Sequence, residues 1–331
     1  MKAVVVRAFG PIDAAKLEEF PDPVAKAGEV LVDVEAVETN YPDVLVIEGR
    51  YQFKPSLPFI PGKAAAGRIA ALGKGVSGLA VGQRVAVQME GGAYASKACV
   101  PAVYCYPVPD AISLVDAAAL VLTYQTAWWA LTDRAQMQAG ESVLVLGAGG
   151  GMGVAAIGLA KALGAGVVIG GTRGQAKAAS VRKAGADHVV DLARPDLREA
   201  LRDEVRALTG GNGVDVVIDS VGDAITDAAL RAMAWRGRLV VIGFAAGDIP
   251  TIRANYLLVK NIAVSGLQAS DYRDRWPREA AHAQAEIFRL CSEGRLAPVV
   301  SEVLPLESFA DALVALREGR AEGKIILRVE R

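Results

Sequence analysis

The chain has 331 residues, of which 52% are hydrophobic and 22% charged, and its formal net charge at pH 7 is -1. This length favours two domains, each large enough to bury its own core. The near-zero charge argues against nucleic acid or an anionic membrane as a partner. No apolar run reaches the roughly 18 residues that a membrane-spanning helix needs.

Two features indicate a cytoplasmic protein. The first residues, "MKAVVVRAFGPIDAAKLEEF", hold only a short Val run before charged side chains, unlike a signal peptide. The three cysteines, Cys99, Cys105 and Cys291, are odd in number and form no CxxC pair. This usage is typical of a reducing compartment without a disulfide framework.

The first third of the chain predicts strands of a largely antiparallel domain. Its Val-rich runs are bounded by Gly or Pro: "KAVVVRAF", "GEVLVDVEAV", "AAAGRIAALG" and "GQRVAVQM". Pro42, Pro55, Pro58 and Pro61 crowd the stretch after Asn40, which is therefore expected to be mostly loop.

A different pattern begins near Val115. The segment "DAAALVLTYQTAWWALTDRAQMQAG" has helical spacing and ends at Gly140. Strands and helices then alternate, which predicts a parallel sheet covered on both faces. The predicted strands are "SVLVLGA", "GVVIGG", "HVVDL", "VDVVIDSVG", "RLVVIGF" and "IAVSGL". The last segment, "SEVLPLESFADALVALREGRAEGKIILRVE", is similar in texture to the first third and is expected to fold back onto it.

The stretch "VLVLGAGGGMGVAA" joins a predicted strand to a predicted helix through a glycine-rich turn. Such a turn presents backbone N–H groups and the positive end of a helix to a phosphate. The strict GxGxxG spelling is absent, but two relaxed registers fit: Ala148, Gly150 and Gly153, or Gly151, Gly153 and Ala156. The turn predicts dinucleotide binding, and a tight turn without a ligand is the alternative.

The next predicted strand leads into "GGTRGQAK", which indicates the type of dinucleotide. A site for NAD needs an acidic residue near the end of this strand to bind the ribose hydroxyls. The chain has no Asp or Glu between the end of this strand and Asp187. Arg173 and Lys177 stand where a 2′-phosphate would lie, so charge complementarity favours NADPH. The alternative for both residues is a solvated surface cation.

The order and spacing of several motifs resemble one family over nearly the whole chain. These motifs are "TNYPDVLVIEGRY", "LPFIPGKAAAGRI", "VGQRVAV", "AAALVLTYQTAWWAL", the glycine turn, "GADHVVDL", "GVDVVIDSVG", "GRLVVIGFAAGDIP" and "GRAEGKIIL". They are similar to those of the zeta-crystallin-like NADPH:quinone oxidoreductases, zinc-free members of the medium-chain dehydrogenase/reductase superfamily. The resemblance implies an α/β fold: a Rossmann-type doubly wound parallel sheet at 123–261, and a mainly β, GroES-like catalytic domain at 1–122 with 262–331.

The resemblance also implies site residues by position. Asn40 and Tyr51 correspond to residues of the family's substrate cleft, and Lys177 to its 2′-phosphate ligand. The implied cofactor contacts are Asn40, Thr126, Ala148, Gly149, Gly150, Gly151, Met152, Gly153, Lys177, Val221, Gly222, Gly243, Phe244, Ala245, Gly266, Leu267, Gln268 and Arg320. The chain departs from the family at Leu45, Ala64, Arg173 and Leu192, which affects the substrate pocket and the adenine pocket.

A catalytic metal is not expected. The chain has two histidines, His188 and His282, neither in a zinc-binding motif, and its cysteines are not clustered. Without a Lewis acid, hydride transfer is best suited to a quinone or another conjugated carbonyl, whose product anion is delocalised.

Two residues are candidates for catalysis. Tyr51 is predicted to position the acceptor oxygen or supply a proton, because its flanking "EGRYQFKP" loop resembles the cleft loop that carries a tyrosine in related enoyl reductases. Its phenol can donate a hydrogen bond at neutral pH. A half-buried loop tyrosine is the alternative. Asn40 is the second candidate, with an amide that holds loop backbone as its alternative. Asp43 is expected to support the loop.

Three functions stay open at this point. The first is an NADPH-dependent quinone reductase; the second is a C=C reductase of enoyl thioesters, alkenals or haloacrylates; and the third is an NADPH-binding structural or regulatory protein. The segment "KNIAVSGL" predicts the last, edge strand of the cofactor sheet, which needs covering. The resemblance implies a homodimer that pairs across this edge.

Overall fold

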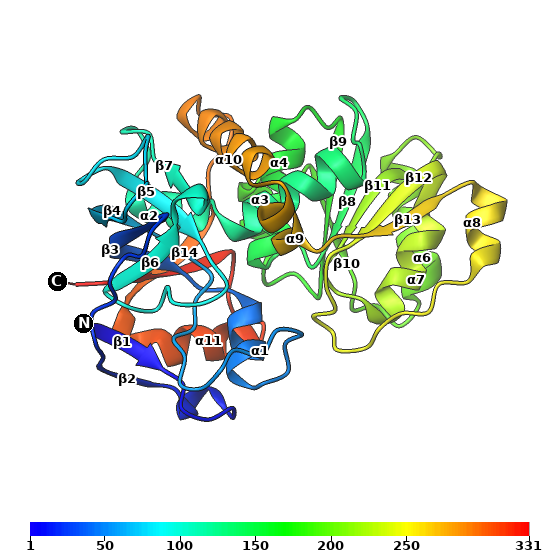
Figure 1. The fold of residues 1–331 in the computed structure, drawn as a ribbon. Helices are drawn as coiled ribbons and strands as arrows, with labels where there is room; N and C mark the ends of the chain where they lie inside the picture. The colour runs from blue at the N-terminus through cyan, green and yellow to red at the C-terminus, as the bar shows by residue number, and fades with distance from the viewer. Residues whose placement is uncertain (331) are drawn as a thin grey trace. The chain divides into compact units, whose positions relative to one another are not determined.

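A computed structural model describes residues 1–330, which divide into two units (Figure 1). The first unit comprises Met1–Leu122, Tyr272–Gly294 and the chain from Val300 onward. The second comprises Thr123–Asp271 and Arg295–Val299. Each unit has its own sheet.

The first unit is built on a seven-stranded, mostly antiparallel sheet in the order β14-β15-β3-β4-β5-β7, with β6 also paired to β3. The strands are β3 (Glu29–Glu38), β4 (Ala64–Leu72), β5 (Arg84–Gln88), β6 (Lys97–Pro101), β7 (Cys105–Pro107), β14 (Val300–Pro305) and β15 (Lys324–Arg328). Val30, Val32 and Val34 of β3 are buried while the residues between them are half-exposed, the alternation expected of a strand with one core face. A separate two-stranded sheet joins β1 (Lys2–Val5) to β2 (Lys16–Glu19).

The long strand β3 has two partners along one edge. Its first half pairs with β6 and its second half with β15, which lies almost 300 residues further along the chain. The prediction that the last segment folds back onto the first third is therefore confirmed. The helices of this unit are α1 (Tyr41–Ile47), α2 (Leu114–Ala119), α10 (Pro277–Ser292) and α11 (Phe309–Arg317), and α11 packs against α1 (Figure 1). Short 3-10 turns occupy Ile12–Ala14, Ala102–Tyr104 and Leu306–Ser308.

The proline-rich stretch after Asn40 is mostly loop, as expected, but it begins with the short helix α1. Pro42 lies in its first turn, where the missing N–H has no intrahelical partner in any case. The Asn40 N–H donates to Asp43 Oδ2 (2.9 Å), which fixes the start of the helix. The described residues 48–63 contain no helix or strand, as expected of the remainder.

The second unit is a six-stranded, all-parallel sheet in the order β10-β9-β8-β11-β12-β13. The strands are β8 (Ser142–Leu146), β9 (Val167–Thr172), β10 (His188–Asp191), β11 (Val214–Asp219), β12 (Met233–Val241) and β13 (Ala263–Gly266). All six predicted strands are present, and β13 is an edge strand as predicted.

Helices cover both faces of this sheet (Figure 1). The helices of this unit are α3 (Leu122–Trp129), α4 (Gly151–Ala162), α5 (Ala178–Lys183), α6 (Leu197–Leu208), α7 (Asp223–Ala232) and α8 (Ala254–Lys260), with a π-helical turn at Ala130–Arg134. Helix α9 (Ala269–Arg275) begins in this unit and ends in the first. Leu144 and Leu146 of β8 share a core with Leu201 of α6 and Ile225 of α7. The predicted fold class, a doubly wound α/β sheet with a mainly β second domain, is confirmed.

The second unit runs to Asp271, whereas the expected cofactor domain ends at 261, just before β13. Among the described residues, no helix is long and apolar enough to cross a membrane.

A buried ion pair links β15 to the end of β3. The Lys324 ammonium lies 2.6 Å from Glu38 Oε1, and the two side chains are 3% and 0% exposed. The same ammonium donates to Thr39 O (3.0 Å) and to Asn40 Oδ1 (2.9 Å). The other Glu38 oxygen accepts the Leu122 N–H at 3.2 Å. The charges are thus paired and hydrogen-bonded, the condition under which burial is tolerated.

We expect Lys324→Met to lower the unfolding free energy by about 3–5 kcal/mol, because it leaves a buried carboxylate uncompensated. The double variant Lys324→Met with Glu38→Gln removes both charges, so its unfolding free energy should fall by less than that of the single variant. Urea denaturation of the three proteins measures the difference. A double variant less stable than the single one would contradict this account.

Candidate functional site

The glycine turn lies between β8 and α4, at the carboxyl end of the parallel sheet. Gly147 has a φ of 71°, which glycine adopts without strain. A Cβ at Gly153 would stand 2.4 Å from Gly147 O and 2.5 Å from Ala148 Cα, so α4 packs directly on the turn. A Cβ at Gly150 would have no neighbour closer than 3.6 Å. The turn is therefore closed on its helix side and open at Gly150, where a pyrophosphate could approach the backbone.

Helix α4 starts at this open side. It has 12 residues and no acidic side chain in its first turn. The first N–H groups of any helix lack intrahelical acceptors, and the helix dipole makes this end positive. The predicted set from Ala148 to Gly153 thus lies together at a helix end suited to an anion.

Lys177 lies against the turn, although it belongs to the segment after β9. A Cβ at Gly149 would come within 2.5 Å of Lys177 Cδ, so the lysine stem crosses the face of that glycine. Arg173 is exposed directly after β9. The structure thus brings Lys177 to the glycine turn, and Arg173 lies four residues before it in the same loop.

Asp191 is a carboxylate near this loop that the sequence reasoning missed. It ends β10 and accepts the backbone N–H of Gly174 (2.8 Å) and Ala193 (2.9 Å). These two hydrogen bonds, that from Ala193 first, lower the pKa of Asp191. Asp191 thus holds the loop that carries Arg173. Asp191 can hold this loop because β10 lies next to β9 in the sheet, and the sequence alone does not show that proximity.

The loop after β11 is held by a fully buried carboxylate, Asp219. Its Oδ1 accepts the N–H of Val221 (2.8 Å) and of Gly222 (3.0 Å). The loop after β12 is tied to it, since the Ala245 N–H donates to Ser220 O (3.0 Å). These loops follow parallel strands and therefore share the sheet edge of the glycine turn.

The other predicted cofactor residues of this unit follow the same edge. Gly243 and Phe244 precede Ala245 in the loop after β12. Gly266 ends β13, and the Leu267 N–H donates to Val241 O (3.0 Å). Gln268 comes next.

Two predicted residues lie elsewhere. Thr126 is in α3 and 8% exposed. Arg320 belongs to the first unit, where its exposed guanidinium donates to Glu318 Oε2 at 2.7 Å.

In the first unit, Asn40 is buried at the start of α1. Its Oδ1 accepts from Lys324, and its Nδ2 lies 3.5 Å from Glu38 O. The amide is thus oriented by the buried ion pair, which agrees with the alternative that it holds loop backbone.

Tyr51 lies just past the end of α1, where its N–H donates to Leu45 O (3.1 Å). The Lys63 ammonium stands 4.8 Å from the centre of its ring, within the range of a cation–π contact. Lys63 also pairs with Glu90 Oε2 (2.7 Å), and Glu90 Oε1 pairs with Arg273 (2.8 Å). Sequence reasoning missed Lys63, Glu90 and Arg273, because the three lie far apart along the chain.

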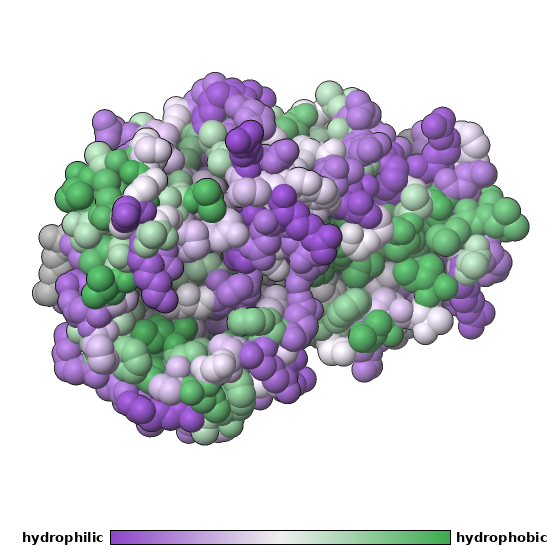
Figure 2. Space-filling view, in the orientation of Figure 1, coloured by the Kyte–Doolittle hydropathy of each residue, from purple (hydrophilic) through white to green (hydrophobic). Residues whose placement is uncertain are grey.

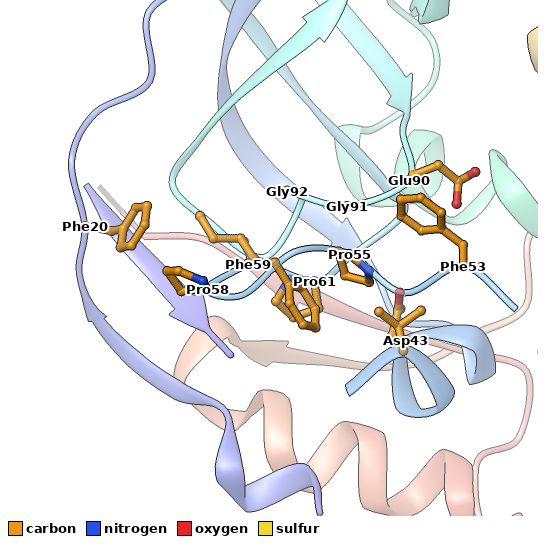
Figure 3. Close-up of a pocket in the computed structure, with 13 residues that line it drawn as sticks. Phe20, Asp43, Phe53, Pro55, Pro58, Phe59, Pro61, Glu90, Gly91 and Gly92 are labelled. Atoms are coloured by element: carbon orange, nitrogen blue, oxygen red, sulfur yellow. The ribbon is translucent and has the colours of Figure 1, made fainter. Parts of the chain in front are cut away.

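A cavity of about 410 Å³ opens beside this cluster (Figure 3). Phenylalanine and proline side chains form most of its wall, and its two carboxylates belong to Asp43 and Glu90. Asp43 Oδ2 accepts from the Tyr94 hydroxyl (3.1 Å). Burial raises the pKa of Asp43 to about 6, against the opposing effect of Lys63.

Two of the departures from the family pattern, Ala64 and Leu192, are well packed. Ala64 is fully buried in β4. Leu192 is 5% exposed and lies against Gly171, where an added Cβ would meet it at 2.9 Å. Neither position supplies a polar group.

His188 and His282 are both exposed. Within residues 1–330, no group of three or more His, Cys, Asp and Glu side chains is placed to hold a metal ion.

Comparisons with known proteins agree with this arrangement. Two family models match: "Alcohol dehydrogenase GroES-like domain" at residues 26–110 and "Zinc-binding dehydrogenase" at residues 151–318. Quinone oxidoreductase-like protein 2 of Bos taurus is 36% identical over 314 residues, covering 95% of this chain and 88% of its own.

Solved structures are similar over the whole length. An Escherichia coli quinone oxidoreductase complexed with NADPH has a TM-score of 0.89 and 30% identity, covering 99% of this chain and 100% of its own. A structure described as an NAD-dependent alcohol dehydrogenase has a TM-score of 0.88 and 31% identity, covering 100% of both chains.

The fold and the glycine turn define a medium-chain dehydrogenase/reductase, an oxidoreductase with a nicotinamide cofactor. Within that superfamily, the chain belongs to the quinone oxidoreductase family. The predicted family is therefore confirmed.

The two glycines of the turn should respond differently to an added methyl group. Gly153→Ala should lower the unfolding free energy by about 1–3 kcal/mol, since its Cβ would collide with backbone. Gly150→Ala, the matched control, has room for its Cβ and should change the free energy by less than about 1 kcal/mol. Urea denaturation measures both, and equal losses would refute the packing argument.

Proposed function

We propose that the protein is a zinc-independent oxidoreductase that transfers hydride from NADPH to a quinone or another conjugated carbonyl. The observation that carries the proposal is the contact of Lys177 with the glycine turn, next to a strand end without an acid. A cation at this place favours a 2′-phosphate, and the missing acid removes the usual partner of an unphosphorylated ribose.

The residues at the glycine turn fit this cofactor. The open space at Gly150 and the helix end of α4 would hold the pyrophosphate, while Lys177 and Arg173 would hold the 2′-phosphate. We propose the remaining predicted contacts, from Thr126 to Gln268 in the second unit and Asn40 and Arg320 in the first, as its further ligands. NADPH supplies a hydride when bound.

A conjugated carbonyl suits this protein as the hydride acceptor. Reduction of a conjugated carbonyl leaves a delocalised anion that a few hydrogen bonds stabilise, so no metal is required. We assign Tyr51 to hold the acceptor oxygen and to donate a proton to it. Lys63 faces its ring and keeps it in place. Asn40 is the second residue of this site.

The activity is tested with purified protein given NADPH or NADH and one of three acceptors: 9,10-phenanthrenequinone, a 2-alkenal or crotonyl-CoA. We expect NADPH oxidation, followed by absorbance, to be fastest with the quinone. Binding of NADPH without turnover of any acceptor would refute the enzymatic proposal, and preference for crotonyl-CoA would favour the C=C reductase.

The cofactor preference is tested by Arg173→Ala with Lys177→Ala. Loss of both cations should raise the KM for NADPH about tenfold or more and leave the KM for NADH nearly unchanged. Lys183→Ala, which removes an exposed cation from the end of α5, is the control. A native protein that prefers NADH would overturn the assignment.

We further propose a homodimer formed through the β13 edge. Helix α8, which directly precedes this edge strand, carries two exposed apolar side chains: Leu258 is 79% and Val259 75% exposed. Figure 2 shows hydrophobic surface at the end of the second unit where α8 lies in Figure 1. An exposed strand edge and an exposed apolar patch both favour association with a second copy of the chain.

Leu258→Asp with Val259→Asp should convert the dimer to a monomer in size-exclusion chromatography with light scattering. Val24→Asp, at an equally exposed valine of the first unit, should leave it unchanged. A monomeric native protein would exclude this interface.

A further inference from the structure

The cavity beside α1 has an almost wholly apolar wall. Apart from the carboxylates of Asp43 and Glu90, the residues around its volume of about 410 Å³ are hydrophobic residues, prolines and glycines. The hydrophobic ones are Phe20, Val46, Phe53, Phe59 and Ile60. Asp43 is 1% exposed and Glu90 is paired with two cations, so neither offers a free charge to a ligand. A wall of this kind favours a hydrocarbon occupant.

Contacts within the first unit hold this wall in place. Phe59 exchanges two backbone hydrogen bonds with Val6, of 2.8 and 3.0 Å, and the Gly92 N–H donates to Ile60 O at 2.8 Å. The Phe59 ring also packs against that of Phe9, with 5.9 Å between the ring centroids. Because the wall is fixed in advance, a ligand loses little affinity to the ordering of side chains and loops.

The cavity has two chemically different ends. Figure 3 shows Phe20 at one end, and Phe53 with Glu90 at the other. The second end adjoins the proposed acceptor site, because Glu90 binds Lys63, whose ammonium lies 4.8 Å from the centre of the Tyr51 ring. Phe20 directly follows β2, so the cavity leads from the acceptor site toward the two-stranded sheet.

We propose that this cavity binds an aliphatic chain carried by the hydride acceptor, and that Phe20 determines the preference for a long chain. The inference rests on the proposed function, since the reacting carbonyl lies at the Tyr51 end. The favoured acceptor is a quinone or enone with an uncharged hydrocarbon substituent. A charged or strongly polar chain would lose its hydration without gaining a partner in the wall.

Chain length should produce a graded gain in affinity. Each methylene that passes from water to an apolar wall contributes a factor of about three to four. A chain that enters at the Glu90 end meets Phe53 first and Phe20 last. A short chain therefore depends on Phe53, and a long chain depends on both phenylalanines.

The test uses three quinones with the same ring, 2,3,5-trimethyl-1,4-benzoquinone, that carry a methyl, butyl or octyl group at the remaining ring carbon. Full substitution prevents addition of cysteine thiols to the ring. KM and kcat are measured on the full chain with NADPH, and Kd by isothermal titration calorimetry without NADPH. We expect KM and Kd to fall about tenfold or more from methyl to octyl, with kcat changed by less than about twofold.

Variants locate the chain. Phe20→Ala should reduce the ratio of octyl to methyl affinity about tenfold, and Phe53→Ala should weaken the butyl and octyl quinones alike. Phe53 is 49% exposed, so its variant tests the site even where Phe20→Ala fails to fold. Leu57→Ala is the matched control, an exposed apolar residue of the same loop outside the wall. Circular dichroism checks the folding of each variant.

The outcomes separate this inference from the proposed function. Equal Kd values for the three quinones, binding of none, or a gain with chain length that both phenylalanine variants retain would overturn the chain site. Turnover of the methyl quinone would then still support the proposed function. A chain-dependent Kd that the variants remove, without turnover of any quinone, would keep the chain site and refute hydride transfer to quinones.

Discussion

The first unit depends on the ion pair between Glu38 and Lys324. A buried ammonium requires several acceptors, and Lys324 finds three of them where β3 ends: a carboxylate, a backbone carbonyl and the Asn40 amide. The pair therefore joins the last strand to the sheet and sets the orientation of Asn40. Helix α1 starts at that amide, and both Asp43 and Tyr51 take their places from it.

The second unit is organised by a different constraint, the close packing of glycines. Helix α4 approaches β8 so closely that Gly153 has no room for a side chain, while Gly150 has space in front of it. Carboxylates then hold the neighbouring loops by their backbone N–H groups, Asp219 after β11 and Asp191 beside the loop after β9. The result is a row of fixed backbone at one sheet edge, which is the usual place for a nucleotide in such folds.

The two units differ in the charge that they offer a ligand. The glycine turn carries a helix end and Lys177, and both favour phosphate. The cavity of the first unit has a mostly apolar wall, and its two carboxylates belong to the buried Asp43 and to Glu90, which pairs with Lys63 and Arg273. A phosphate is therefore favoured at the glycine turn of the second unit.

Local pattern was sufficient for much of the fold. Runs of Val and the alternation of strand and helix located the six parallel strands, the β13 edge and the glycine turn, because strands buried on both faces are short continuous apolar runs. The motifs and their order along the chain were sufficient to predict the family. The short helix α1 is not predicted by this pattern, because proline disfavours helices in general, although a proline in the first turn is compatible with one.

Tertiary structure alone decided which charges meet. Lys63 and Glu90 are 27 positions apart, and Arg273 and Glu90 are 183 apart. Asp191 reaches its loop from the neighbouring strand, and Lys324 reaches Asn40 from the other end of the chain. Such pairs leave no period in the sequence, since they form only when the sheet brings distant segments together. The amino-acid sequence by itself therefore determined the elements and the family, while the folded structure determined the polar contacts that orient the site.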